Sequence, residues 1–482
     1  MNRTPLAAAA ALALAACSFA PRYQRPDAGV PEQHRFAPPA KDAASLADLP
    51  WWEAFRDPVL QGLIREALAN NQDLALAASR VDEARAFAGI AKADYWPQVA
   101  AFASGQYGQL FSKEVAPGAE KTGLYGLSAS VSWEIDLWGR VRNQSAAAVA
   151  DLVATEYGRQ AVVLALVSGV AQSYLDLRSL DLELEIAKAN TATRKGTLDL
   201  FQSRARGGIA SDLEVNQARA DLAFTSSAIP ATERLIAVKE HELSVLLGKA
   251  PGPIDRGVPL VSTPIPPEMP AGVPAQLLER RPDVLAAEQG IVAAGKRVGV
   301  AVANRFPQLS LAGLIGLEAR EASNVFTANA LLWNAGGSLL APIFQGGRLK
   351  ASEEAARAQL EQSFAAYRKS VEIALREVAD AAVSVQKLRL VRIEQQVQVT
   401  ATTEAARLAL LRYQGGVSSY LEVLDAQRQQ YDAELSLART RRDELTSVVQ
   451  LYRALGGGWG REEAGPEAAK PAEGGGPPPS KG

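Results

Sequence analysis

A strict two-residue alternation at residues 124–140, LYGLSASVSWEIDLWGR, limits the folds open to this chain more than any other feature. Successive side chains of a β-strand point to opposite faces, so the pattern predicts a strand with one oily face and one wet face. The even positions from 126 to 134 carry glycine, serine and glutamate. The oily face must meet either a protein core or lipid, and its residues are Tyr125, Leu127, Ala129, Val131, Trp133 and Ile135.

The alternating segment belongs to a long internal repeat. Three pairs of segments match: DYWPQV with NRFPQL, ARGGIASDLEV with YQGGVSSYLEV, and LLGK with ALGG. Pro97 and Pro307 stand 210 positions apart, and Gly207 and Gly415 stand 208 apart. Two matched halves of this length indicate a structural duplication and not a short-period solenoid.

Each half follows one predicted plan. A helix comes first, over about 70–93 and again over 283–302, and the repeated proline ends it because a helix interior excludes proline. Two strands follow. In the second half they are predicted at 308–318 and at about 332–344, the latter with the weaker alternation.

A very long helix then begins at Arg140 and, in the second half, at Arg348. Apolar residues recur with a 4,3,4,3 spacing over 163–184 and 360–388, which is the spacing of a coiled-coil seam. A Gly-Gly pair reverses the chain, since glycine adopts the left-handed backbone that such a turn needs. Each half is therefore predicted to be a β-hairpin attached to a long antiparallel helical pair.

The N-terminus has the pattern of a bacterial export signal. Arg3 precedes an apolar run, 6–16, which is too short to span a bilayer as a helix. LAAC, at 14–17, resembles the lipobox in which the cysteine becomes the lipidated first residue, and Cys17 is the only cysteine of the chain. Ser18 resembles the residue that sorts lipoproteins to the outer membrane. The alternative is an ordinary signal peptide with an incidental cysteine.

Beyond this signal the sequence has no apolar run of 18 residues, and the longest, AVVLALVSGV, lies inside an amphipathic pattern. If the chain crosses a membrane, it must do so with closed β-structure. Four strands are too few, because the smallest membrane barrels have about eight. Hairpins of several chains are therefore predicted to close one barrel, with the oily face of 125–135 on lipid. A soluble sandwich is the alternative. Tyr125, Trp133 and Trp138 are candidates for the lipid interface, with ordinary packing as the other reading.

The composition argues against two classes of function. A formal net charge of -2 over 482 residues is unlike a nucleic-acid binder, which needs a clustered basic excess. His34 lies in the Pro-rich N-terminal segment, and His241 is the one histidine of its predicted helix, with no second ligand three or four residues away. No glycine-rich phosphate loop stands between a strand and a helix. We expect no enzyme, no catalytic residue, no metal and no cofactor.

Several motifs, in order, resemble those of the lipidated, nodulation-type outer-membrane efflux factors, the exit ducts of tripartite RND efflux pumps. The resemblance covers almost the whole mature chain. Its segments are WWEAFRDPVLQGLIREALANNQDL, MPAGVPAQLLERRPDVLAAEQ, PIFQGGR, YLEVLDAQR and ALGGGW. The second of these, at 269–289, is the most specific.

The resemblance implies a mixed α and β membrane protein that forms a homotrimer. Each chain would give four strands to a transmembrane β-barrel in the outer membrane and helices to an α-helical coiled-coil tunnel in the periplasm. The duct would passively conduct drugs or other small molecules, with a periplasmic adaptor (membrane fusion) protein and an inner-membrane RND-type pump as partners. The alternative is a lipid-anchored, non-conducting coiled-coil spacer of the envelope.

The resemblance also implies a periplasmic gate. Tyr413 matches a gate-latching aromatic residue, and Ser418 stands where some members carry a charged gate residue. Glu422 and Asp425 match acidic residues that ring the closed aperture, and their spacing of three places them on one helix face. Carboxylates from three chains would attract cations there. The alternative is a solvated helix start, where the helix dipole favours acidic residues.

The two Gly-Gly turns are the expected adaptor contacts. The first turn contributes Arg206, Gly207, Gly208, Ile209, Ala210 and Ser211, and the second contributes Gly415, Gly416, Val417, Ser418 and Ser419. This assignment rests on the resemblance. The other reading of both turns is simple helix capping without a partner.

The chain is therefore expected to be anchored in the outer membrane at Cys17 and to extend into the periplasm. Its tail is rich in glycine, proline and glutamate and is expected to be disordered. The expected parts are a signal peptide at 1–16, a lipidated segment at 17–69, a first repeat at 70–249, a Pro-rich connector at 250–280, a second repeat at 281–456 and the tail at 457–482.

Overall fold

The computed structural model describes residues 19–31, 55–108, 114, 121–265, 274 and 277–457. The predicted signal peptide, Cys17 and nearly all of the predicted tail lie outside the described residues. The chain divides into two compact units. Unit 1 falls within 1–27, 79–155 and 286–369, and unit 2 falls within 28–78, 156–285 and 370–482. Each unit therefore takes segments from both halves of the sequence.

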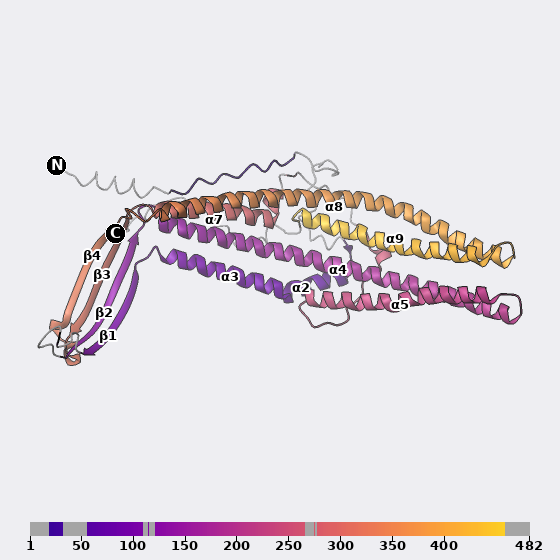
Figure 1. Ribbon diagram of the computed structural model, residues 1–482, viewed down its shortest axis with the longest axis horizontal. Helices are drawn as coiled ribbons and strands as arrows, with labels where there is room; N and C mark the ends of the chain where they lie inside the picture. Colours follow the sequence, from indigo (N-terminus) through magenta and orange to yellow (C-terminus); the bar gives the residue numbers. More distant parts are fainter. Residues whose placement is uncertain are drawn as a thin grey trace, which may run out of the picture. The chain divides into compact units, whose positions relative to one another are not determined.

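The order of elements is similar in the two halves (Figure 1). The first half contains α2 (Pro58–Asn70), α3 (Gln72–Ala93), β1 (Gln98–Gly108), β2 (Thr122–Ile135), α4 (Arg140–Arg206) and α5 (Asp212–Leu246). The second contains η3 (Leu260–Ser262), α6 (Leu277–Arg280), α7 (Pro282–Ala303), β3 (Gln308–Ala319), η5 (Ala322–Asn324), η6 (Ala328–Ala330), β4 (Leu331–Leu340), α8 (Arg348–Gln414) and α9 (Tyr420–Ala454). α4 and α8 have 67 residues each, and α5 and α9 have 35 each.

The predicted helix boundaries are confirmed to within two residues. The long helices begin at Arg140 and Arg348, as predicted. The turns that follow them also have the expected backbone, because the second glycine of each pair is left-handed. Gly208 has φ 74° and Gly416 has φ 76°. A side chain at either position would strain the turn.

The four strands form one antiparallel sheet in the order β1-β2-β3-β4, within unit 1. Residues directly opposite each other in neighbouring strands share a face of the sheet. Val131 lies between Val99 and Gly313, and Trp133 lies opposite Leu311. The predicted oily face of β2 therefore continues across the neighbouring strands.

One strand prediction was too long. β4 ends at Leu340, whereas the alternation was extended to Phe344. Pro342 follows two residues later and has no backbone N–H with which to continue the ladder. The chain then passes through Gly346 and Gly347, both with positive φ, into α8.

The core of unit 2 contains the predicted coiled-coil seams. Val170 and Leu177 of α4 and Val378 of α8 are fully buried, and they pack in one apolar cluster with Leu445 and Val449 of α9. Burying a side chain of this size contributes about 1.5–3 kcal/mol. The seams therefore serve as the packing surfaces between helices.

The apolar character of α4 is explained by this packing. α4 contains an 18-residue window with a mean hydropathy of 1.3, which by length and composition alone would suit a membrane helix. The helix runs through the core, however, and 61% of that window is buried inside the protein. We therefore assign α4 as a core helix.

A buried carboxylate joins three segments of unit 2. Asp57 accepts hydrogen bonds from the backbone N–H groups of Val59 and Leu60 at the start of α2, at 2.9 and 3.2 Å. Its other oxygen accepts from the Tyr174 hydroxyl of α4 at 2.9 Å and from the Val258 N–H at 3.1 Å. Asp57 is only 2% exposed, so each of these donors depends on it.

Asp57→Ala should lower the free energy of unfolding by about 3 kcal/mol, because it removes a helix cap and leaves buried donors without an acceptor. Thermal unfolding followed by circular dichroism measures the effect. Asp73→Ala, at an exposed first-turn position of α3, is the matched control and should cost less than about 1 kcal/mol. Equal losses in the two variants would contradict the role given to Asp57.

Candidate channel wall and gate

The oily face of the sheet is open within the described part of the chain. Val99 is 74% exposed, Ile315 is 58% exposed and Trp333 is 73% exposed. The six predicted residues of β2 lie on this face, and Leu127, Val131 and Trp133 are its most exposed members there. An apolar surface of this extent is typical of an interaction site and unusual on a soluble monomer.

The opposite face of the sheet is mixed in character and almost without charge, with serine and glycine positions beside the exposed apolar side chains of Phe102, Leu124 and Leu340. Ser128 and Ser130 of β2 lie beside Gly316 and Leu314 of β3. The four strands contain two charged residues, Glu134 and Glu318. Glu134 accepts two hydrogen bonds from the Arg140 guanidinium, at 2.7 and 2.6 Å, so its charge is compensated at the start of α4.

The aromatic residues near the sheet have different roles. The Trp133 indole lies at the edge of the oily face and donates to the Tyr95 carbonyl at 3.0 Å. Trp138 instead packs in a cluster with Phe306 and Phe19, at ring distances of 5.0 and 6.3 Å, and donates to the Pro307 carbonyl. Of the two readings of Trp138, packing is therefore the one that the structure favours.

The N-terminal segment 19–27 lies against one face of α7 in unit 1. Glu288 accepts from Tyr23 at 2.5 Å and from Arg25 at 3.0 and 2.9 Å. Three turns later, a Cβ on Gly299 would come within 3.0 Å of the Ala20 backbone. Glycine at 299 therefore permits the close approach of the segment.

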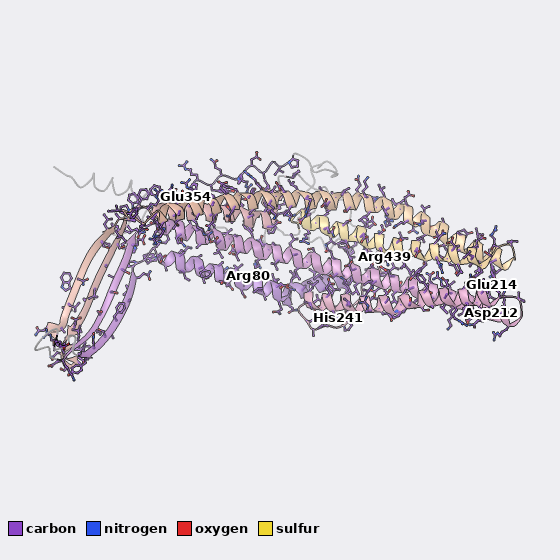
Figure 2. The ribbon with its side chains drawn as sticks, viewed as in Figure 1. Arg80, Asp212, Glu214, His241, Glu354 and Arg439 are labelled. Carbon is purple, nitrogen blue, oxygen red and sulfur yellow. The ribbon has the colours of Figure 1, made fainter. Side chains whose placement is uncertain are left out.

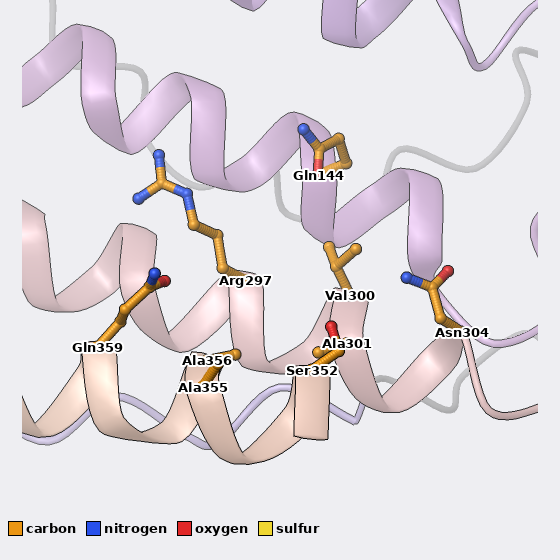
Figure 3. Close-up of a pocket in the computed structure, with 9 residues that line it drawn as sticks. All are labelled: Gln144, Arg297, Val300, Ala301, Asn304, Ser352, Ala355, Ala356 and Gln359. Atoms are coloured by element: carbon orange, nitrogen blue, oxygen red, sulfur yellow. The ribbon is translucent and has the colours of Figure 1, made fainter. Parts of the chain in front are cut away.

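A polar groove of about 250 Å³ lies on the other face of α7 (Figure 3). Arg297 and Asn304 follow Glu288 by nine and sixteen residues, which is about half a turn around the helix. Gln144 of α4 and Gln359 of α8 also line the groove. The helical layer of unit 1 thus has one face in contact with the N-terminal segment and an opposite face with an open groove, which is lined by polar side chains and by small apolar ones.

The two glycine turns have matching surfaces. Ile209 is 79% exposed and Val417, its counterpart 208 positions later, is 67% exposed. Among the other predicted contact residues, Ala210 and Ser418 are half-buried and the rest are exposed: Arg206, Gly207, Gly208, Ser211, Gly415, Gly416 and Ser419. Each turn therefore presents an apolar side chain within a polar surround.

Tyr413 makes a hydrogen bond across the tip of unit 2. Its hydroxyl donates to Glu214 of α5 at 2.9 Å, and the Arg204 guanidinium lies 5.8 Å from its ring centre. Glu214, which Figure 2 labels, in turn accepts from the Ser211 N–H at 2.8 Å, in a capping box at the start of α5. Glu214 was not among the predicted site residues, although Ser-x-x-Glu before an apolar run is the signature of such a box.

Both groups of this bond have shifted pKa values. The hydrogen bond from the Ser211 backbone and the one from Tyr413 lower the pKa of Glu214, so the carboxylate stays ionised. Burial and the hydrogen bond to Glu214 raise the pKa of Tyr413, so the phenol stays protonated and donates. Both pKa shifts therefore favour the hydrogen-bonded pair, in which Glu214 is ionised and Tyr413 is protonated.

The predicted acidic pair has partners within the same chain. Glu422 lies 3.1 Å from the Arg412 guanidinium, and Asp425 accepts from Gln429 at 2.7 Å. The Glu422 and Arg412 side chains are 46% and 57% exposed, so their ion pair is weak. Both carboxylates remain at the surface of α9.

A four-stranded sheet with an open oily face, joined to long helices that turn at glycine pairs, is the fold of outer-membrane channels. The solved outer-membrane channel OprN is 31% identical, with a TM-score of 0.85 over 92% of this chain and 100% of that one. The open state of the MtrE outer membrane channel of Neisseria gonorrhoeae is 29% identical, with a TM-score of 0.79 over 92% and 98%.

The sequence relatives define the family. The probable efflux pump outer membrane protein TtgC of Pseudomonas putida is 33% identical over 464 residues, which are 94% of this chain and 95% of TtgC. The profile of the outer membrane efflux protein family matches residues 63–249 and 273–457. The chain therefore belongs to this family, and the resemblance found in its motifs is confirmed.

Glu214→Gln should remove a pH-dependent protection of the tip. Because the folded pKa of Glu214 is lowered, its contribution is present above the ordinary glutamate pKa of 4.5 and is lost as the pH falls through that value to the folded pKa. Amide exchange of residues 211–215, corrected for intrinsic pH dependence, should be faster in the variant at pH 7 and similar at low pH. Asp212→Asn, beside the box, should leave the profile unchanged, and a similar loss there would contradict the assignment.

Proposed function

We propose that three copies of this chain form an exit duct in the outer membrane, each giving four strands to one shared β-barrel. The observation that carries the proposal is the open oily face of the four-stranded sheet, whose outer strands β1 and β4 have unpaired edges in one chain. In lipid an unpaired edge leaves backbone groups without hydrogen bonds. Pairing β1 of one copy with β4 of the next removes every edge and places the oily face on outer-membrane lipid.

The wet face of the strands and the polar groove on α4, α7 and α8 would then line a water-filled passage. Their serine, amide and guanidinium groups suit a surface that small molecules cross without tight binding. The equal lengths of α4 and α8, and of α5 and α9, support a duplicated tunnel wall in which six similar helical pairs pack side by side. Such a duct conducts drugs or other small molecules passively.

The duct is the outer-membrane part of a tripartite efflux pump in this proposal. A periplasmic adaptor protein contacts the two glycine turns, where Ile209 and Val417 offer exposed apolar contacts beside Arg206 and Arg412. An inner-membrane RND-type pump supplies the solute. Substrate choice then lies with the pump, because a wet passage needs little selectivity of its own.

The gate of this duct is the tip of unit 2. The Tyr413–Glu214 hydrogen bond holds the two helical pairs of one chain together, and Ser418 lies five residues after Tyr413 in the second glycine turn. Glu422 and Asp425 of three copies surround the opening and favour cations. An open state has been solved for the similar channel MtrE, which supports a gate in this proposal.

A lipid on Cys17 is an additional anchor in this proposal, since the barrel itself spans the membrane. The rival function, a lipid-anchored spacer without a passage, accounts for the helical seams. It does not account for an exposed apolar face that continues over several strands.

Purified protein in a planar lipid bilayer should show a small, cation-favouring ion conductance. The double variant Glu422→Ala/Asp425→Ala should lose most of the cation preference, because the charges at the opening are gone. Glu404→Ala, an exposed glutamate that pairs with Arg407 of its own helix, is the control and should keep the preference. An unchanged preference in the double variant would remove these residues from the gate.

Cys17→Ala separates the duct from the spacer. A barrel protein should stay in the membrane fraction without its lipid and need detergent for extraction. A spacer should be released into the soluble fraction. Fractionation of cells that produce the variant measures this, and release by salt alone would contradict the shared barrel.

A further inference from the structure

Two sets of polar contacts hold α4 in unit 2. On one side, Ser173 donates to Glu242 of α5 at 2.8 Å. On the other, Glu183 of α4 accepts from Arg439 of α9 at 2.9 Å, and Asn190 donates to Glu434 at 3.0 Å (Figure 2 labels Arg439). The first set joins α4 and α5 into a helical hairpin within the first half of the chain. The second joins that hairpin to the second half.

Arg194 takes part in both sets of contacts. Its Nε lies 2.8 Å from Asp221 of α5, and its Nη2 donates to the Gln427 carbonyl of α9 at 3.3 Å. The guanidinium also lies 5.5 Å from the ring centre of Tyr431. One side chain of α4 therefore contacts both other helices.

The ion pair of Arg194 and Asp221 is removed from water. The side chains are 2% and 1% exposed, and Nη1 of Arg194 has no hydrogen-bond partner among the described residues. Burial lowers the pKa of Arg194, although Asp221 acts in the opposite direction. A buried pair contributes little net stability but fixes the arrangement of the elements that carry it, since breaking it leaves a buried charge alone.

A second cation shares the same carboxylate. Arg428 of α9 lies 3.6 Å from the other oxygen of Asp221, and its side chain is 58% exposed. Two guanidinium groups thus face one carboxylate, one buried and one at the surface. Neither carboxylate oxygen of Asp221 has a hydrogen-bond partner among the described residues, so ion pairing alone holds the carboxylate. Arg428 can leave this arrangement without exposing the buried pair.

The position of this cluster along α9 connects it to the gate. Gln427 and Arg428 follow Asp425 by two and three residues, and Tyr420 and Glu422 lie in the preceding turns of the same helix. A helix moves as a stiff rod over so short a distance. Whatever fixes residues 427 and 428 against α4 and α5 therefore also fixes the acidic opening.

We infer that Arg194, Asp221 and Arg428 form a positioning site that holds α9 against the α4–α5 hairpin and keeps the tip narrow at rest. The inference rests on the proposed function, because it assigns a cause to the resting state of that gate. Arg194 is the buried cation of the site and stays paired with Asp221. Arg428 is the exposed cation, which can separate from Asp221 when α9 moves.

Arg428→Gln tests the site without disturbing the core, because the side chain is mostly exposed and the new amide keeps its polarity. In the full-length protein, amide exchange of residues 420–431 should become faster, and bilayer conductance should rise roughly fivefold, as expected when a coupling between two states is lost. Arg428→Lys should restore part of the effect. Arg407→Gln is the matched control, since Arg407 is 57% exposed and pairs within its own helix.

Arg194→Lys provides a second test inside the core. Lysine keeps the charge but has one ammonium group, which cannot meet Asp221 and the Gln427 carbonyl in the same planar geometry. Exchange should again rise in residues 420–431 and remain unchanged in the core around Val170 and Leu445. That local pattern would distinguish release of α9 from general unfolding.

The outcomes separate this inference from the proposed function. Wild-type conductance with no change in Arg428→Gln, whether or not exchange rises, would overturn the inference and leave the duct standing. Faster exchange in Arg428→Gln but no conductance in any form would support the positioning of α9 and contradict the duct. Faster exchange together with higher conductance, absent from Arg407→Gln, is the expected result.

Discussion

Lipid offers no hydrogen-bond partner to the edge of a β-sheet, and this constraint governs the rest of the molecule. The chain builds four strands whose oily face is open, with β1 and β4 as edges. A sheet of this kind is incomplete as a single copy. α4 and α8 begin a few residues after β2 and β4. In the proposed assembly the helices therefore have the same symmetry as the closed sheet. In that assembly, the number of chains that close the sheet also sets the number of helical pairs around the proposed passage.

The helices combine two kinds of contact with different consequences. The apolar seam around Val170, Val378 and Leu445 supplies stability, because it removes large side chains from water. The polar contacts between α4 and its neighbours contribute little net stability but specify how α5 and α9 are aligned along α4. An interface held by few, directional contacts can exchange one arrangement for another at small cost. A gate needs such an interface next to a core that does not change.

The sequence was most informative where structure depends on neighbours in the chain. The alternation of β2, the prolines before the strands and the glycine turns are local signals, and each led to the observed element. The end of β4 was missed because its glycines weaken the alternation before Pro342 stops the ladder. The partners of Tyr413 and Arg194 were also missed, since Glu214 and Gln427 lie 199 and 233 residues away in the chain. Trp138 shows the same limit, because only the fold brings Phe19 and Phe306 to it.

The near absence of charge on the wet face of the strands has a consequence for how such a duct is used. Glu134 is paired with Arg140, and Glu318 is the other charged residue of the strands, so in the proposed duct the strand-lined section discriminates little between anions, cations and uncharged solutes. A passage that does not select among solutes can serve any pump that docks on it. A cell could therefore acquire a new export route by changing the pump alone, and retain the same outlet for many chemically unrelated compounds.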